Sequence, residues 1–240
     1  MMQRADKLLY IKGLCRSRSA AQTLIEEGKV YCGKRLVIKP SELLDENSEL
    51  TVTEAQKYVS RGGYKLEYAL ERFDIKVKDD ICADIGASTG GFTDCLLQHG
   101  AKLVYAIEGG HGQLDPSLQN DNRVVSIENF NARELDINTT KELCDTVVMD
   151  VSFISQTLLH KNVYSILKDG GKFITLIKPQ FEAGKENIGK HGIASASSYE
   201  AVKNKVITSA ESCGFKFAGI DVSVIKGGDG NTEFIAYFVK

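Results

Sequence analysis

The sequence predicts an α/β protein in which a wound, mostly parallel sheet follows a small α+β unit. Three observations predict it. From Tyr58 onward, short apolar runs alternate with segments of helical periodicity, and the runs lack the period-two pattern of a half-exposed sheet. One run, residues 81–85, leads directly into glycines and then into a helical segment. Residues 1–57 instead combine short helices, short strands and uneven charge, so we expect two domains, at 1–57 and 58–240.

The first domain is expected to contain two helices and several short strands. An apolar side within residues 4–14 predicts the first helix. Residues 19–22 have the form of a capping box, in which Ser19 caps the second helix, Gln22 reaches back, and Gly28 marks its end. Short strands are expected at residues 30–32, 36–38 and 49–52.

Charge is distributed unevenly, although the formal net charge is only −2. Residues 1–40 carry nine Lys or Arg against three acids, whereas residues 41–56 carry five acids and no base. A basic N-terminal unit is a candidate surface for nucleic acid. A charge cluster is equally compatible with a solvated face, so composition alone leaves both interpretations open.

Composition narrows the class of protein further. The 240 residues are 42% hydrophobic, enough for one α/β domain and a small second unit. No stretch approaches the roughly 20 apolar residues of a membrane helix, and the N-terminus is too charged for a secretory signal, which predicts a cytoplasmic protein. The six cysteines form no Cys-x-x-Cys pair and the four histidines lack metal-ligand spacing, so we expect buried thiols and no metal.

The second domain is expected to form a seven-stranded sheet. Runs typical of buried parallel strands are at residues 81–85, 103–107, 124–127, 146–149 and 173–177. A last helix near residues 199–213 leads to two strands, at 215–225 and 233–239, whose glycine-rich connection predicts a hairpin. A seven-stranded sheet with one reversed strand is the Rossmann-like arrangement of methyltransferases, and its ligand binds at the carboxyl ends of the strands.

The turn after residues 81–85 is the first candidate for a ligand site. Gly86 and Gly90 would let the backbone approach a group that a Cβ would block, and the next helix offers free N–H groups. Glu108 closes the next apolar run, about where a doubly wound fold places the acid that binds a ribose diol. Taken alone, such a turn can also be a plain strand-to-helix connection.

The spacing of the glycines indicates which ligand fits. The Gly-x-Gly-x-x-Gly pattern that cradles a pyrophosphate is absent. S-adenosylmethionine carries no phosphate, and its sulfonium cation tolerates a nearby acid such as Asp84, so we expect this cofactor rather than a dinucleotide. Further cofactor contacts are expected from Ser88, Gly91, Glu128, Asn129 and Asp150.

Four charged residues stand at the ends of predicted elements, where side chains can converge. They are Lys65 in the helix that opens the second domain, Asp150 after the fourth strand, Lys178 after the fifth, and Glu233 before the last. Taken singly, Lys65 is compatible with an exposed helix lysine and Glu233 with a simple strand start. Asp150 and Lys178 each follow several apolar strand residues, so each faces solvent or a ligand at the top of the sheet.

Lysine, aspartate, lysine and glutamate in this order on this fold resemble the signature of ribose 2′-O-methyltransferases related to the FtsJ/RrmJ rRNA methyltransferase. Longer motifs resemble the TlyA family of rRNA (cytidine-2′-O)-methyltransferases, historically called haemolysins. They lie at residues 60–63, 84–93, 150–155, 176–182 and 227–231. The resemblance covers nearly the whole chain and implies an S-adenosylmethionine-dependent enzyme whose partner is ribosomal RNA or a ribosomal subunit. Residues 108–116 depart from the pattern, with Glu108 where an aspartate is expected.

The first domain resembles the αL RNA-binding module of a small-subunit ribosomal protein, pseudouridine synthases and tyrosyl-tRNA synthetases. The matching residues are Arg4, Asp6, Leu9, Ser17, Arg18, Ala21, Leu24, Ile25, Gly28, Val30, Gly33, Lys39 and Pro40. The resemblance implies phosphate contacts from Lys12, Arg16, Arg18, Lys34 and Arg35. Such binding depends on salt and reads little sequence.

The resemblance also implies roles for the four charged residues. A ribose 2′-hydroxyl is a weak acid whose oxygen must attack a methyl carbon activated by positive sulfur, so alignment and late proton removal are the main demands. We expect Lys178 to be the base, Asp150 to orient it near the methyl group, and Lys65 with Glu233 to position the hydroxyl. Burial and the charge of Lys65 favour a neutral amine at position 178, whereas Asp150 favours the ammonium.

Three other functions are compatible with parts of this pattern. An amino-group methyltransferase usually has two prolines and an aromatic after the acid or amide of the fourth strand, whereas this chain has Asp150-Val-Ser-Phe153. A membrane-active haemolysin would need a long amphipathic or apolar insertion segment, which the sequence lacks. A nonenzymatic RNA-binding or ribosome-assembly factor would not need the four charged residues.

Overall fold

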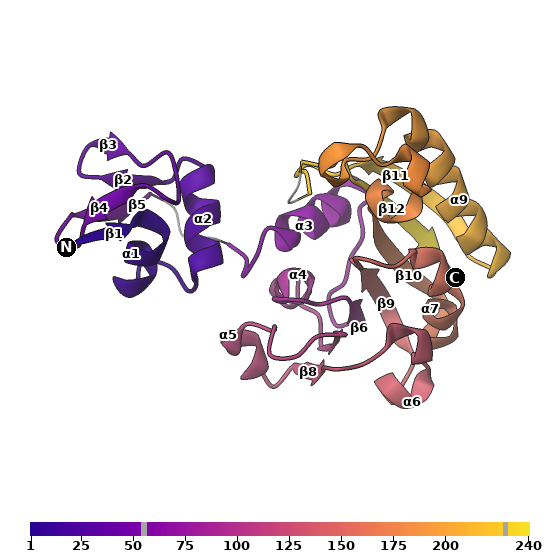
Figure 1. Ribbon diagram of the computed structural model, residues 1–240. Helices are drawn as coiled ribbons and strands as arrows, with labels where there is room; N and C mark the ends of the chain where they lie inside the picture. Colours follow the sequence, from indigo (N-terminus) through magenta and orange to yellow (C-terminus); the bar gives the residue numbers. More distant parts are fainter. Residues whose placement is uncertain (54–56, 228–229) are drawn as a thin grey trace. The chain divides into compact units, whose positions relative to one another are not determined.

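The computed structural model describes residues 1–53, 57–227 and 230–240. Glu54, the last acid of the run at 41–56, and two residues of the glycine-rich motif at 227–231 lie outside the described residues. The chain divides into two compact units, Met1–Arg61 and Gly62–Lys240 (Figure 1). The expected boundary between residues 57 and 58 stays a prediction, and each unit is considered by itself.

The N-terminal unit combines two short helices with small antiparallel sheets. The helices are α1 (Ala5–Ile11) and α2 (Arg18–Glu26). The strands are β1 (Met2–Arg4), β2 (Val30–Cys32), β3 (Arg35–Leu36), β4 (Leu43–Asp45) and β5 (Leu50–Val52). β1 pairs with β4, and β2 pairs with both β3 and β5. The sequence did not indicate β1 and β4, because Met2–Arg4 and Leu43–Asp45 contain no β-branched or aromatic residue, unlike β2 and β5.

The expected cap of the second helix is wrong by two residues. Ser17, with an extended backbone, is the N-cap of α2, and its hydroxyl accepts a hydrogen bond from the Ala20 N–H at 3.1 Å. Ser19 therefore lies in the first turn of the helix. Apolar side chains of α1, α2, β2, β4, β5 and the residue after β3 form the core of this unit, and its members include Leu8, Leu9, Leu24, Ile25, Val30, Val37, Leu44 and Leu50.

The C-terminal unit contains the expected seven-stranded sheet. Its strands are β6 (Ile81–Ile85), β7 (Leu103–Ile107), β8 (Val124–Ile127), β9 (Cys144–Met149), β10 (Leu167–Ile177), β11 (Lys216–Val222) and β12 (Phe234–Val239). Their spatial order is β11-β12-β10-β9-β6-β7-β8, and β12 is the strand that runs antiparallel to its neighbours. This confirms the Rossmann-like arrangement with one reversed strand and a terminal hairpin.

Helices cover both faces of this sheet. They are α3 (Gly62–Arg72), α4 (Gly91–Gln98), α5 (Pro116–Gln119), α6 (Ile137–Thr140), α7 (His160–Ile166), α8 (Pro179–Glu182) and α9 (Tyr199–Ser212). α3 packs with α4, whereas α7 packs with α9 across the sheet from them (Figure 1). Single 3-10 turns occur at Ala132–Glu134, Gln156–Leu158, Lys185–Asn187, Lys190–Gly192 and Ala196–Ser198. Every residue of β6 is buried, which explains why its sequence shows no alternation.

The register of the strands determines which residues meet at the carboxyl edge. Ile85 pairs with Met149, Met149 with Thr175, and Ile177 with Phe234. The segments that follow β6, β9 and β10 therefore lie next to one another, together with the segment that precedes β12. In a wound sheet this is the edge where ligands bind.

Candidate active site

Asp84 lies under the turn that connects β6 to α4. It is fully buried, and its Oδ2 atom accepts hydrogen bonds from the Thr93 N–H at 2.9 Å and the Thr93 hydroxyl at 2.7 Å. Its Oδ1 atom has no hydrogen-bond partner among the described residues. Burial raises the pKa of Asp84 to about 7; the charges of Asp150 and Glu108 add to the rise, and the bonds from Thr93 oppose it.

Gly86 and Gly90 are required by the protein's own packing. Both have positive φ, +81° and +93°. A Cβ on Gly86 would lie 2.6 Å from the backbone oxygen of Asp150, and a Cβ on Gly90 would overlap the Leu118 side chain. The sequence predicted that a ligand would come close to the backbone at these glycines. In the structure, other parts of the chain make this close contact. The contact at Gly86 places the segment that starts with Asp150 against the turn. Gly91 is the first residue of α4.

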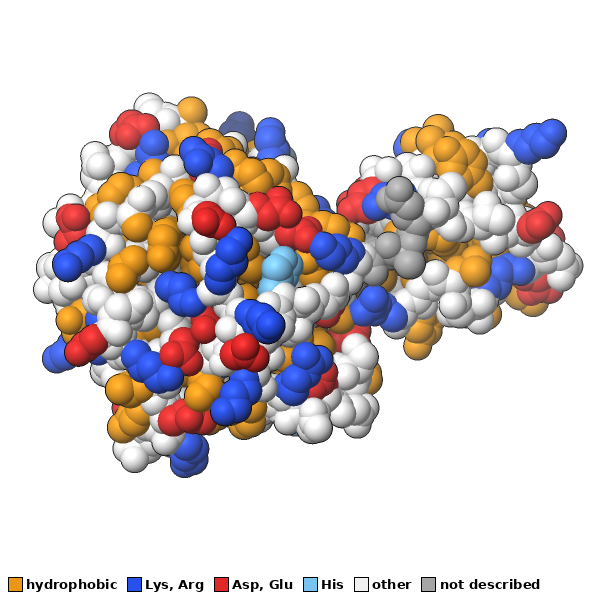
Figure 2. All heavy atoms as spheres, turned by 180° about the vertical axis from the view of Figure 1, so that it is seen from behind, with side chains coloured by type: hydrophobic (Ala, Val, Ile, Leu, Met, Phe, Trp, Pro, Cys, Tyr) orange, Lys and Arg blue, Asp and Glu red, His pale blue; other side chains and the backbone are white. Residues whose placement is uncertain are grey.

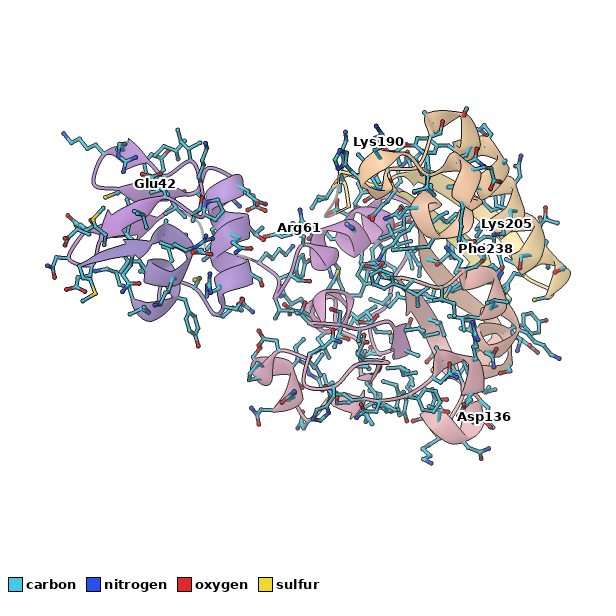
Figure 3. The ribbon with its side chains drawn as sticks, in the orientation of Figure 1. Glu42, Arg61, Asp136, Lys190, Lys205 and Phe238 are labelled. Carbon is cyan, nitrogen blue, oxygen red and sulfur yellow. The ribbon has the colours of Figure 1, made fainter. Side chains whose placement is uncertain are left out.

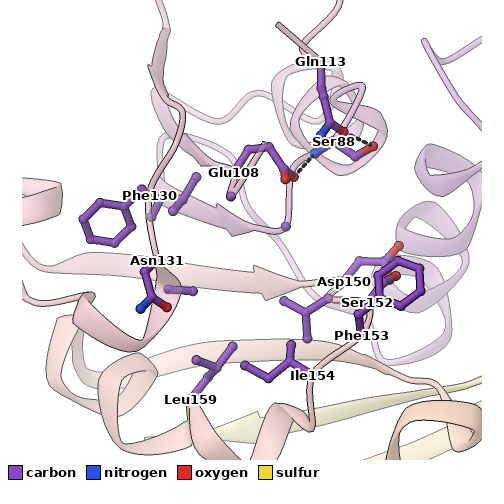
Figure 4. Close-up of a pocket in the computed structure, with 15 residues that line it drawn as sticks. Ser88, Glu108, Gln113, Phe130, Asn131, Asp150, Ser152, Phe153, Ile154 and Leu159 are labelled. Atoms are coloured by element: carbon purple, nitrogen blue, oxygen red, sulfur yellow. Dashed lines mark hydrogen bonds between the residues drawn. The ribbon is translucent and has the colours of Figure 1, made fainter. Parts of the chain in front are cut away.

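A cavity of about 460 Å³ opens at the carboxyl edge of the sheet (Figure 4). Its polar lining comes from Ser88, Glu108, Gln113, Asn131, Asp150 and Ser152. Its larger apolar side chains are Ile107, Phe130, Val151, Phe153, Ile154 and Leu159. A mostly apolar cavity of this volume with a few polar groups is typical of a small-molecule site.

Glu108 is fixed in the cavity by backbone N–H groups. Its Oε2 atom accepts from the Ser88 N–H at 2.8 Å (Figure 4). Its Oε1 atom accepts from the Gly110 N–H at 2.8 Å. The Ser88 hydroxyl donates to the side-chain oxygen of Gln113 at 3.3 Å. Each carboxylate oxygen of Glu108 can accept a further hydrogen bond, as from a ribose hydroxyl.

Glu128 and Asn129 lie outside the cavity lining, in contrast to the expectation. Glu128 accepts from the Gly112 N–H at 2.8 Å and lies 3.0 Å from His111. Asn129 adopts a positive φ of +54°, so the chain turns there, and residues 130–132 line the cavity instead. The sequence could not show at which residue the chain turns after β8, because a single asparagine such as Asn129 is a weak signal for a turn.

Lys178 and Asp150 form an ion pair at the same edge. The Lys178 Nζ atom lies 2.6 Å from Asp150 Oδ1 and donates to the Ser152 hydroxyl at 2.9 Å. Their side chains are 13% and 22% exposed, so the pair is largely shielded but can be reached. Asp150 also lines the cavity, and it therefore stands between the amine and any bound cofactor.

Lys65 and Glu233 form a second ion pair, more deeply buried than the first. Lys65 Nζ donates to Glu233 Oε2 at 2.6 Å, and the side chains are 10% and 2% exposed. Because Ile177 pairs with Phe234, Glu233 lies across the strand pair from Lys178. The four charged residues predicted from the sequence thus occur as two pairs along one edge; their catalytic roles stay predictions.

Phe153 is a functional candidate that the sequence reasoning did not identify. Its side chain is 92% exposed at the cavity, and its φ is +63°, which is costly for a bulky residue. The centroid of its ring lies 5.1 Å from the centroid of the Phe181 ring. The signal was an aromatic residue three positions after Asp150, inside the motif at residues 150–155, to which no role of its own was given.

In the N-terminal unit, two of the predicted phosphate contacts are already paired with acids. Arg18 donates to the fully buried Asp6 at 3.0 Å, and Arg35 lies 2.6 Å from Glu42 (Figure 3). Lys12, Arg16 and Lys34 are exposed. The view in Figure 2 shows basic and acidic side chains intermingled over one face of the C-terminal unit. Contact of the five basic residues with RNA stays a prediction.

The cavity suits a cationic cofactor. Among the described residues its charged lining consists of two acids, Glu108 and Asp150. Asp84 lies buried behind the turn, and its Oδ1 atom has no hydrogen-bond partner within the part of the chain that the structure describes. A pyrophosphate would be repelled by Glu108, the acid of the lining that has no basic partner among the described residues, whereas a positively charged group would be stabilised. Within the described parts of the chain, no cluster of three potential metal ligands occurs, and no helix is long and apolar enough to span a membrane.

The sheet order, the cavity at its carboxyl edge and the acidic lining define an S-adenosylmethionine-dependent methyltransferase. Residues 58–240 match the FtsJ-like methyltransferase family, to which this chain belongs, and residues 3–50 match the S4 domain. This confirms the fold and the class of enzyme predicted from the sequence.

Proteins related over almost the full chain carry two kinds of name. Hemolysin A of Brachyspira hyodysenteriae is 44% identical over 238 residues, covering 98% of this chain and 99% of that protein. The 16S/23S rRNA (cytidine-2′-O)-methyltransferase TlyA of Mycobacterium tuberculosis is 39% identical over 241 residues, covering 98% and 88%. A solved structure designated a hemolysin, from Streptococcus thermophilus, superimposes with a TM-score of 0.79 at 45% identity and covers 100% of this chain and 88% of that one.

Proposed function

We propose that this enzyme transfers a methyl group from S-adenosylmethionine to the 2′-hydroxyl of a cytidine in ribosomal RNA. The observation that carries the proposal is the row of two ion pairs, Lys178 with Asp150 and Lys65 with Glu233, beside an acidic cavity. The relatives named as rRNA (cytidine-2′-O)-methyltransferases support the same substrate. The S4 domain supports RNA as the partner, and the cytoplasm is the location we expect.

We assign the cofactor contacts to residues of the turn and the neighbouring strand ends. When bound, S-adenosylmethionine supplies an electrophilic methyl group on a positively charged sulfur. Glu108 would accept hydrogen bonds from the ribose, and the apolar side chains of Ile107 and Phe130 would enclose the adenine. Asp150 and the buried Asp84 would stabilise positive charge. Ser88 helps by holding Glu108 in place.

Lys178 is assigned as the base that accepts the proton of the 2′-hydroxyl. In the proposed step, the lone pair of the neutral Lys178 amine accepts the hydroxyl proton, while the nitrogen stays beside Asp150 and Ser152. The Asp150 carboxylate, 2.6 Å from the Lys178 Nζ atom, would orient the amine toward the hydroxyl. Ser152 then keeps the amine directed by a neutral hydrogen bond.

Lys65 and Glu233 are assigned to hold the hydroxyl in line with the methyl group. Their pair is nearly inaccessible to water, and a fixed pair of this kind is suited to orient a neighbouring hydroxyl. The exposed ring of Phe153 offers a surface on which a nucleobase could stack once it leaves its helix. Lys12, Arg16, Arg18, Lys34 and Arg35 would bind RNA phosphates.

The experiment that tests this function is nucleoside mass spectrometry of ribosomal RNA from cells with and without the protein. We expect one 2′-O-methylcytidine to disappear, together with the resistance of that ribose to alkaline cleavage. A lost methyl group on a base would instead indicate an amino-group methyltransferase.

The hemolysin names of several relatives raise an alternative function, lysis of membranes, which a second experiment tests. Purified protein that lyses membranes, with lysis unchanged when Lys178 is replaced by alanine, would support a membrane-active protein. Lysis that is absent while ribosomal particles accept labelled methyl groups would support the enzyme.

A further inference from the structure

A polar cluster built around buried side chains, with the half-exposed Lys205 at its edge, lies behind the two segments that carry Asp150 and Lys178. Its members, which the proposed function leaves without a role, are Ser155, Gln156, Thr175, Glu182 and Lys205. Gln156 is 2% exposed and Glu182 6% exposed. Neither lines the cavity, so neither is placed to touch a cofactor there.

Glu182 connects the two segments directly. Its Oε1 atom accepts from the Gln156 N–H at 2.7 Å, and its Oε2 atom accepts from the Ser155 hydroxyl at 2.6 Å. Glu182 ends α8, which begins directly after Lys178, whereas Ser155 and Gln156 close the segment that starts at Asp150. One carboxylate therefore links the chain that carries the proposed base to the chain that carries its partner.

Two further side chains hold this link in register. Lys205 on α9 donates to Glu182 Oε2 at 3.0 Å and to the Glu182 carbonyl at 2.9 Å (Figure 3). The Gln156 side chain accepts from the Thr175 hydroxyl at 2.7 Å and donates to the Leu176 carbonyl at 3.2 Å. The buried carboxylate thus has an ammonium as partner, and Gln156 is anchored to β10 just before Lys178.

The segment that starts at Asp150 needs such an anchor, because it contains an unfavourable backbone. Phe153 has a φ of +63°, which persists only where the surroundings over-determine it. The first end is bound to β6, since the Asp150 N–H donates to the Ile85 carbonyl at 2.9 Å. The second end is bound by Glu182. Releasing the second end would let the turn relax and move Ser152 and Asp150.

We propose that Glu182 is a positioning residue for methyl transfer, which acts through Ser155 and Gln156 to set the place of Asp150 relative to Lys178. The inference rests on the function proposed above. Glu182 does not reach the reacting groups, so its loss should slow the transfer step and leave the affinity for S-adenosylmethionine nearly unchanged.

The test uses the variant Glu182→Gln, which keeps the shape of the side chain and removes its charge. The matched control is Glu200→Gln, an acid on α9 whose side chain is 79% exposed. We expect the single-turnover rate of methyl transfer to ribosomal particles to fall about tenfold or more, since small misplacement of reacting groups is costly. The dissociation constant of S-adenosylmethionine, measured by calorimetry, should stay within about twofold. The control should match the unmodified protein.

A second variant keeps the test decisive if Glu182→Gln does not fold. Ser155→Ala removes one donor to the carboxylate and should by itself slow transfer, by less than Glu182→Gln, with cofactor affinity retained. Where both variants fold and act through one bond, the double variant should be little slower than Glu182→Gln alone. Additive effects, or a loss that lies entirely in cofactor affinity, would overturn the proposal.

Hydrogen exchange separates this inference from the proposed function, because it needs no substrate. Backbone amides of residues 151–156 should exchange faster in Glu182→Gln than in Glu200→Gln. Unchanged exchange together with an unchanged transfer rate would refute the positioning role. An unmodified protein that transfers no methyl group to RNA would refute the proposed function, while faster exchange in the variant would still support the anchor.

Discussion

Lys65 and Glu233 are 168 positions apart in the chain, yet their side chains form a buried hydrogen bond of 2.6 Å. The contact exists because the reversed strand β12 begins beside the end of β10 and faces the helix α3. It places a second ion pair next to that of Lys178 with Asp150. Two adjacent pairs at the open edge of the sheet are the physical basis of the proposed transfer.

Replacing Lys65→Met should destabilise the protein strongly. Glu233 is 2% exposed and would be left as a buried charge without a partner, which typically costs about 3–5 kcal/mol. Urea denaturation of the variant and the unmodified protein measures the difference in free energy of unfolding.

A double variant separates stability from catalysis at this pair. Lys65→Met with Glu233→Leu removes both charges and should recover much of the lost stability, while methyl transfer stays low. Transfer at the unmodified rate by the double variant would show that the pair has only a structural role.

The sequence predicted the sheet, the reversed strand and the four charged residues, because each depends on local apolar runs and on the residues at their ends. It could not predict which charges pair, since pairing depends on the register between β10 and β12. It did not indicate that Phe130 and Asn131 line the cavity, because the positive φ of Asn129 turns the chain there; cofactor contacts from Glu128 and Asn129 stay predictions. The cap at Ser17 was missed because a second serine two residues later offers the same chemistry.

Asp84 should make stability depend on pH. Its pKa in the folded protein is raised to about 7 from an ordinary value of 3.8, so the folded state keeps a proton that the unfolded state has lost between these values. The free energy of unfolding should therefore decrease as pH rises from about 4 to about 7. Asp84→Asn should flatten this dependence, measured by urea denaturation at several pH values. The exposed Asp74→Asn is the control, and an equal slope in both variants would contradict the assignment.

Phe153 should contribute to RNA binding at the expense of stability. Phe153→Gly relieves the positive φ and should stabilise the protein by about 1 kcal/mol. The same change should weaken productive binding of the RNA substrate by about 1–3 kcal/mol, the usual size of a base–aromatic stack. Thermal denaturation and the KM for ribosomal particles measure the two effects. Phe153→Tyr keeps the ring and should retain activity; loss of activity there would argue against stacking.

The basic residues of the N-terminal unit should differ in their effect on RNA affinity. Lys34→Ala should lower the slope of log affinity against log salt by about 1, as expected for one phosphate contact. Arg35→Ala should have a smaller effect, because Arg35 is already paired with Glu42 at 2.6 Å. Filter binding at several salt concentrations, with the exposed Lys76→Ala as control, tests this order. Equal slopes for Lys34→Ala and Lys76→Ala would place the RNA elsewhere.

The most direct test concerns the amine of Lys178. The measurement is the single-turnover rate at which labelled methyl groups from S-adenosylmethionine reach ribose 2′-oxygens in ribosomal particles, compared between the unmodified enzyme and Lys178→Met. Loss of a general base typically lowers a rate by about 10²–10⁴-fold, so the account predicts a fall of that size with cofactor affinity retained. A variant that transfers methyl groups at the unmodified rate would contradict it.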